Sequence, residues 1–124
     1  MTKKWTHDQL KSFSKANDMR ISPFYPDGKT YGTPTHIWSV VVENNLYSRP
    51  YSGTKWYKSA ITQKAGKIHL AGKDYKVKFA AANGNPTLNK KINQAYQNKY
   101  QGDMAVPTMI SAENANHTVR IDPE

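Results

Sequence analysis

The sequence predicts a mainly β protein of the α+β class, with about six short strands in a small closed or half-closed antiparallel barrel and three helices. Three observations predict this class. Short β-rich runs lie between turn residues, apolar stripes recur at helical spacing, and no linker divides the chain. A chain of 124 residues buries one core, so we expect residues 1–124 to form a single domain.

A helix is predicted near the start of the chain. Thr6 and Gln9 have the spacing of a capping box, in which each side chain accepts a hydrogen bond from the backbone of the other residue. Leu10 and Phe13 then lie on one apolar stripe at helical spacing, and Asn17-Asp18 is the expected end. We expect this stripe to pack on the body of the protein.

A short strand and a long loop follow the helix. Residues 19–22 alternate between apolar and polar side chains, which predicts a strand. The segment from Pro23 to Pro34 predicts a loop with its turn at Asp27-Gly28. A loop of this length in a small domain is often functional.

The central hairpin is predicted from a hydrophobic run. Residues 36–43 are rich in β-branched side chains, which indicates a strand buried on both faces or in a barrel wall. Asn44-Asn45 is the expected two-residue turn, and residues 46–51 are the returning strand. Pro50 indicates that the end of this strand lies at an edge or a bulge.

A second helix and a second hairpin follow. Residues 54–64 have an apolar side and a lysine side, and Gly66 is the expected stop signal. Residues 67–71 and 74–79 alternate around Gly72-Lys73, which predicts a hairpin with its lysines and His69 outside.

The last third of the chain predicts one helix and two closing strands. Asn85 is the expected N-cap and Pro86 the first helical residue. The apolar face of this helix should pack inward, and its solvent-facing side should carry Lys90, Lys91 and Lys99. Residues 107–110 and 117–121 are the expected closing strands.

The charge of the chain points to an anionic partner. The formal net charge is +9 and the pI is about 9.7. Residues 49–78 carry eight lysine and arginine residues against one acid, Asp74. A phosphate-bearing cofactor or another anionic small molecule is the expected partner, with nucleic acid as the less favoured one. Solubility alone is the alternative explanation of the charge.

Several kinds of chemistry have no signal in the sequence. The chain has no cysteine, and none of its four histidines has a partner at metal-ligand spacing, so we expect no metal site. No nucleophile elbow or acid/base carboxylate pair indicates hydrolysis, and no catalytic residue is assigned. No apolar run reaches membrane-spanning length, so we expect a cytoplasmic protein that does not contact a membrane.

One loop has residues suited to binding phosphate. Ser48, Arg49, Ser52, Gly53 and Thr54 come directly before the second helix. Hydroxyls, a guanidinium and the free N–H groups of a helix N-terminus together attract anions. An ordinary helix capped by Thr54 is the alternative interpretation, and local sequence alone favours it.

The chain also resembles a bacterial family known as domain of unknown function 2255, over about residues 6 to 121. The resemblance is carried by Ile21 to Phe24, Asp27 to Thr35, Ile37 to Val42, Leu46 to Arg49, Trp56-Tyr57, Gln63 to Ile68, Ala95-Tyr96 and Lys99-Tyr100. More remotely, the pattern is similar to the deazaflavin-dependent nitroreductases of the FMN-binding split-barrel superfamily. This similarity implies a split β-barrel of the FMN-binding type.

The nitroreductase resemblance also implies a cofactor, FMN or a deazaflavin. It implies that Arg49, Ser52 and Lys55 face the cofactor phosphate and that the ring system lies near Trp38 and Ser48. The candidate cofactor-binding residues are Lys29, Trp38, Ser48, Arg49, Ser52, Gly53, Thr54, Lys55, Trp56 and Tyr57. The Asn-Leu that follows Trp-Tyr in the nitroreductases is replaced here by Lys58-Ser59-Ala60, which weakens the deazaflavin interpretation.

Three functions stay open at this point. The leading one is a flavin- or deazaflavin-dependent oxidoreductase, in which the cofactor supplies hydride chemistry. The second is a non-enzymatic binding module for an anionic ligand or nucleic acid, using the basic surface of residues 49–78. The third is a barrel that has kept the fold without a cofactor. The superfamily resemblance also implies a possible homodimer.

Overall fold

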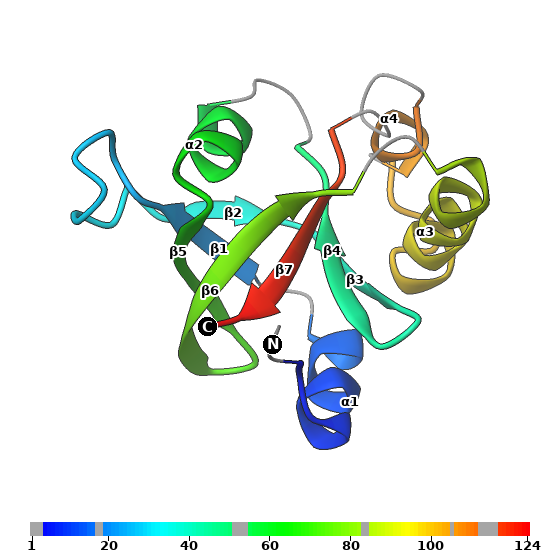
Figure 1. Ribbon diagram of the computed structural model, residues 1–124. Coiled ribbons are helices and arrows are strands. Elements are labelled where there is room, and N and C mark those ends of the chain that lie inside the picture. The colour runs from blue at the N-terminus through cyan, green and yellow to red at the C-terminus, as the bar shows by residue number, and fades with distance from the viewer. Residues whose placement is uncertain (1–3, 17–18, 51–54, 83–84, 105, 112–116) are drawn as a thin grey trace.

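The computed structural model describes residues 4–16, 19–50, 55–82, 85–104, 106–111 and 117–124 (Figure 1). Its helices are α1 (His7–Lys15), α2 (Lys55–Gln63), α3 (Pro86–Lys99) and α4 (Val106–Met109). Its strands are β1 (Met19–Pro23), β2 (Thr35–Ile37), β3 (Ser39–Val42), β4 (Asn45–Ser48), β5 (Ala65–Leu70), β6 (Lys73–Ala81) and β7 (Val119–Pro123).

The strands form one antiparallel sheet in the order β2-β1-β5-β6-β7-β4-β3. The two outermost strands of this order, β2 and β3, are consecutive in the sequence and are separated only by Trp38. Because the chain passes from one end of the sheet order to the other at this residue, the sheet curls into a nearly closed barrel (Figure 1). The predicted α+β class with a barrel-like antiparallel sheet is confirmed, with one strand and one helix more than expected.

The predicted continuous strand over 36–43 is wrong in one respect, because it is divided at Trp38. The part before Trp38 pairs with β1, where Ile37 lies opposite Met19, and the part after it pairs with β4. A single hydrophobic run thus contributes to both ends of the sheet order. Periodicity could not show the division, because both parts are rich in β-branched residues.

Both hairpin turns lie one residue earlier than predicted. The first turn is Glu43-Asn44, with φ of 51° and 68°, instead of Asn44-Asn45. The second is Ala71-Gly72, with φ of 54° and 79°, instead of Gly72-Lys73. Two successive residues with positive φ are typical of the type I′ turns of tight hairpins. The predictions were wrong because the second residue of each expected turn already pairs in a strand.

The prediction that Gly66 ends α2 is wrong, because Gly66 lies within β5. The helix ends at Gln63, and Lys64 takes a φ of 61° after it. A Cβ atom on Gly66 would lie 2.4 Å from Ser22 O and 2.7 Å from Pro23 Cα, so this glycine lets β1 and β5 approach closely.

The remaining elements confirm the helix predictions and correct one strand. Thr6 and Gln9 form the capping box of α1, and the Asn85 side chain accepts from Leu88 N at 3.1 Å to cap α3. The helix α1 ends at Lys15, and Asn17-Asp18 lies outside the described residues. The predicted strand over 107–110 is wrong, because α4 occupies this segment and a proline is tolerated in the first turn of a helix. The second closing strand is β7.

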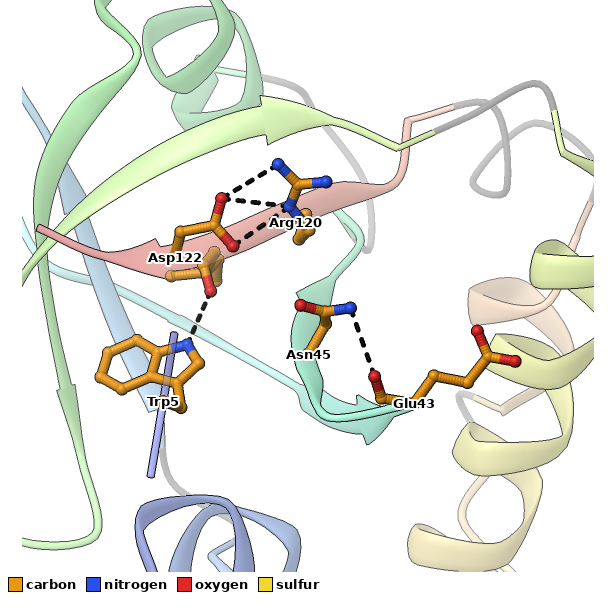
Figure 2. A network of polar contacts seen from close by, with 6 residues as sticks. Trp5, Glu43, Asn45, Arg120 and Asp122 are labelled. Carbon is orange, nitrogen blue, oxygen red and sulfur yellow. Dashed lines mark hydrogen bonds and ion pairs between the residues drawn. The ribbon is translucent and has the colours of Figure 1, made fainter. Parts of the chain in front are cut away.

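The core lies inside the barrel and beneath α1 and α3, which lie on different sides of it (Figure 1). Ile68 and Leu70 of β5 and Val77 of β6 are fully buried, while the lysines of these strands point outward as predicted. Figure 2 shows how Trp5, before α1, donates its indole N–H to Ile121 O at 2.8 Å. This bond joins the N-terminal segment to β7, beside an ion pair of Arg120 with Asp122.

Candidate functional site

Part of the predicted phosphate-binding loop lies outside the described residues. Ser52, Gly53 and Thr54 belong to that part, and so does the side chain of Lys55, the first residue of α2. Lys29 is exposed in the loop between β1 and β2, where its backbone N–H donates to Asp27 Oδ1 at 2.9 Å. For these residues, contact with a cofactor stays a prediction.

Arg49 follows β4, and its side chain is completely buried. Its Nε donates to Thr118 Oγ1 at 3.0 Å, and Nη1 donates to Asn93 Oδ1 at 2.5 Å and to Met109 O at 3.2 Å. Nη2 lies 3.5 Å from Asn89 O. Burial lowers the pKa of Arg49, and within the described ranges no carboxylate forms an ion pair with it. The guanidinium therefore joins β4, α3, α4 and the residue before β7.

Trp38 and Ser48 are also engaged inside the protein. Ser48 is fully buried, and its hydroxyl donates to Trp38 O at 2.6 Å. The half-buried Trp38 ring stacks on Tyr100, with 3.9 Å between the ring centroids and 3° between the planes. The described side chains of Arg49, Trp38 and Ser48 thus contact other parts of the protein, and their contact with a cofactor stays a prediction.

Aromatic residues gather at the first turn of α2, as the resemblance implies. Trp56 is buried, and Tyr57 is half-buried beside His117, with their ring centroids 4.8 Å apart in an edge-to-face arrangement. The two aromatic rings of α2 lie 6.4 Å apart. The described residues leave a partly exposed tyrosine at the place where the nitroreductase resemblance positions a cofactor.

The outer face of β1, β5 and β6 carries three of the eight cations predicted for the basic surface, Lys67, Lys76 and Lys78. Lys67 of β5 lies directly opposite Lys76 of β6, and the exposed Lys78 follows two residues later on the same face. Arg20 of β1 pairs with His69 of β5, so its side chain lies on this face as well. We call Arg20, Lys67, Lys76 and Lys78 the basic face.

A pocket of about 180 Å³ lies on the basic face. Arg20, Ser22, Lys67 and His69 line it, together with one acid, Asp74. The carboxylate Oδ1 of Asp74 lies 2.7 Å from His69 Nδ1, so this acid is held by the histidine. The pocket combines two cations, a hydroxyl and an imidazole, which are groups that bind phosphate or carboxylate.

The loop between β1 and β2 is held against the basic face. Its aromatic rings Phe24 and Tyr31 stack with centroids 4.9 Å apart, and Lys67 Nζ lies 4.9 Å from the centroid of the Tyr31 ring. Asp27 closes the predicted turn by accepting from Lys29 N and from Thr30 N, both at 2.9 Å. The hydrogen bond from the Thr30 hydroxyl, above all, lowers the pKa of Asp27.

Lys99 does not lie on the solvent-facing side of its helix, contrary to the prediction. It is half-buried, and its Nζ donates to Ser39 O at 2.7 Å and to Phe13 O at 3.1 Å. Burial lowers the pKa of Lys99 to about 8. The prediction was wrong because α1 and β3 cover the end of α3, which the periodicity of α3 alone could not show.

The sequence interpretation missed the contributions of Arg20 and Ser22 to the pocket. Both residues stand at alternate positions of the predicted strand over 19–22, so their shared face was readable. Their pairing with β5 was not readable, because three strands and a helix lie between β1 and β5 in the sequence and offer β1 several other partners.

The described part of the chain shows neither a metal-binding cluster nor a membrane-spanning helix. It contains no group of three histidine or acidic side chains arranged to bind a metal ion. Among its helices, none has the length and apolar character needed to cross a membrane.

Comparison with known proteins gives a family and a fold. A bacterial family described as "Uncharacterized protein conserved in bacteria (DUF2255)" matches residues 9–121. No curated protein matches the sequence. Among solved structures, the conserved hypothetical protein Rv2991 from Mycobacterium tuberculosis is similar, with a TM-score of 0.56 and 11% identity over 99% of this chain and 81% of that one. This likeness concerns the fold alone. The family match covers most of the sequence, and the chain belongs to the bacterial family DUF2255.

Proposed function

We propose that this protein binds a phosphate-bearing or otherwise anionic ligand on its basic face. The observation that carries the proposal is the pocket in which Arg20, Lys67, His69 and Ser22 meet. These side chains come from two strands that are far apart in the sequence, and sheet pairing brings them together. A bound anion would accept hydrogen bonds from several of them at once, including charge-assisted bonds from Arg20 and Lys67.

The pairing of lysines across β5 and β6 supports the proposal. Like charges placed directly opposite each other on a sheet cost up to about 1 kcal/mol. Lys67 and Lys76 are such a pair, and the acid that lines the pocket, Asp74, is engaged by His69. An anion bound to Lys67 in the pocket would offset part of this repulsion. At about 180 Å³ the pocket fits one anionic group, and the rest of the ligand would extend over the surface.

Calorimetric titration with inorganic pyrophosphate tests the proposal. Arg20→Gln and Lys67→Gln should each weaken binding about tenfold or more, since a hydrogen bond to a charged group contributes about 1.5–3 kcal/mol. Lys90→Gln is the matched control, because it removes the same charge from an exposed position on α3. Equal losses in all three variants, or no saturable binding, would contradict a specific site.

Salt dependence separates a small ligand from nucleic acid on the same face. A compact anion contacts few cations, so its affinity should fall modestly with salt. If four cations neutralise four phosphates of a single-stranded nucleic acid, the logarithm of the binding constant should fall with the logarithm of the salt concentration with a slope of about −3. Titration of a thymidine oligonucleotide and of pyrophosphate across the same salt series distinguishes the two classes of ligand.

A second candidate function is a flavin- or deazaflavin-dependent oxidoreductase. It is supported by the barrel-like fold together with the aromatic residues Trp56 and Tyr57 at the first turn of α2. A bound cofactor of this kind supplies hydride transfer, and the protein's own part is to hold and orient it. The half-buried Tyr57 would pack against the ring system, and the hydroxyl-bearing loop before α2 would bind the phosphate.

Fluorescence titration with FMN and with a deazaflavin cofactor tests the second candidate. Tyr57→Ala should weaken cofactor binding by about tenfold, because an aromatic ring contact contributes up to about 1.5 kcal/mol. Lys67→Gln should leave cofactor binding unchanged. If Lys67→Gln and not Tyr57→Ala weakens binding, the flavin phosphate binds only as an anion on the basic face. Absence of binding by either cofactor would refute this candidate without affecting the first.

A further inference from the structure

We propose that the groove between α1, β3 and α3 binds a small amphipathic carboxylate, whose head group is held by Lys99 and Lys15. The groove has a volume of about 620 Å³ and lies apart from the basic face, which is formed by β1, β5 and β6. Its apolar lining includes Val40 and Ala95, while Ser14, Asn98 and the two lysines provide its polar groups.

Lys99 has one N–H donor that can bind such a ligand. A lysine ammonium has three N–H donors, and two of them are directed to Ser39 O and Phe13 O. The third is free to bind a group in the groove that Lys99 lines. Neither acceptor is charged, so among the described residues the half-buried ammonium has no anionic partner, and a ligand carboxylate would supply one.

The charged groups around Lys99 favour an anion over other ligands. Lys15 of α1 lines the same groove, Tyr100 of α3 lies with its ring centroid 5.3 Å from Lys99 Nζ, and β3 contributes only apolar side chains to the lining. No acidic side chain lines the groove among the described residues. The apolar lining beside two cations therefore fits a ligand with a hydrocarbon body and one carboxylate.

Proton uptake measured by calorimetry provides a specific test, with octanoate as the probe. Titration at pH 8 in two buffers of different ionisation enthalpy should show uptake of up to about half a proton, because about half of the Lys99 amines are neutral at their pKa of about 8. Lys99→Arg keeps a permanent charge and should bind octanoate without uptake. Lys99→Met should bind about tenfold more weakly or worse.

Further variants locate the ligand and separate this site from the basic face. Lys15→Gln should weaken octanoate binding, whereas Lys67→Gln should not change it. Octanol, which lacks the carboxylate, should bind more weakly than octanoate. Circular dichroism confirms that each variant is folded.

Three results would overturn the inference. These are the absence of saturable octanoate binding, binding without proton uptake by the unmodified protein, and equal affinity for octanol and octanoate. None of them bears on pyrophosphate binding at Arg20 and Lys67, so the inference and the proposed function can fail independently.

Discussion

A buried arginine can be a structural residue even where a sequence pattern suggests a ligand. Arg49 comes at the end of a strand, before a loop rich in hydroxyls, and this context predicts a phosphate contact. In the structure its guanidinium donates to neutral oxygen atoms of α3, of α4 and of Thr118, the residue before β7. Sequence could not show these partners, because Asn93, Met109 and Thr118 lie 44 to 69 residues further along the chain.

Replacing Arg49 should therefore destabilise the protein in the absence of any ligand. Arg49→Met should lower the free energy of unfolding by about 2–4 kcal/mol, since each buried acceptor left without a donor costs about 1–3 kcal/mol. Urea unfolding at neutral pH measures the change. Lys90→Met, at an exposed position, is the control and should change stability by less than about 0.5 kcal/mol. A stable Arg49→Met variant that has lost only ligand binding would restore the role implied by the resemblance.

Lys99 should make stability depend on pH. Its pKa is about 8 in the folded protein and 10.5 as the ordinary value, so between these values the unfolded chain binds more protons. The free energy of unfolding should therefore rise from pH 8 towards pH 10 in the unmodified protein, relative to Lys99→Met. Burial raises the pKa of Tyr100 to about 12, which opposes this trend above pH 10, so the measurement is best made below that pH. If the free energy of unfolding changed with pH in the same way in the two proteins, the lowered pKa of Lys99 would be contradicted.

At the scale of elements, local signals predicted the helices better than the exact turns. The capping residues Thr6 and Asn85 mark real helix starts, because capping depends only on residues within one turn. The hairpin turns were displaced by one residue, because strand pairing decides which residues are left in the turn. Ala71 consequently takes a positive φ of 54°, although this conformation favours asparagine or glycine.

The second hairpin can therefore be stabilised by changing one residue. Ala71→Asn would create an Asn-Gly type I′ turn and should raise the free energy of unfolding by about 0.5–1 kcal/mol. The side chain of Ala71 is exposed, so the change should not disturb packing. Ala71→Val is the opposing control and should destabilise, since β-branched residues avoid positive φ. Thermal unfolding of both variants measures the difference, and a destabilised Ala71→Asn variant would contradict the assigned turn.

At the scale of the whole molecule, the excess of positive charge is partly gathered on one face of the barrel. The sequence located the basic segment but not the contribution of Arg20, because that residue reaches the face only through pairing of β1 with β5. The groove at Lys99 was likewise invisible in the sequence, since three separate elements form it. Composition indicated an excess of positive charge, and tertiary pairing decides where these charges meet.

This distribution of charge should make stability sensitive to salt. In a chloride buffer of low ionic strength, Lys76→Gln should raise the free energy of unfolding by about 0.2–1 kcal/mol, by relieving repulsion with Lys67. The gain should shrink at about 1 M salt, where the screening length falls to about 3 Å. Urea unfolding in both buffers measures it. A variant that is less stable at low salt would mean that Lys76 makes a favourable contact instead of a repulsive one.

The position of β7 in the sheet has a consequence for folding and aggregation of the protein. This strand lies between β6 and β4 and pairs with both, although it comes last in the order of the elements. Before β7 pairs, no hydrogen-bonded strand joins β2-β1-β5-β6 to β4-β3, and the facing edges of β6 and β4 are unpaired. Exposed strand edges in such an intermediate are open to pairing with other chains. Docking of β7 therefore completes the barrel and also removes the two edges at which aggregation would begin.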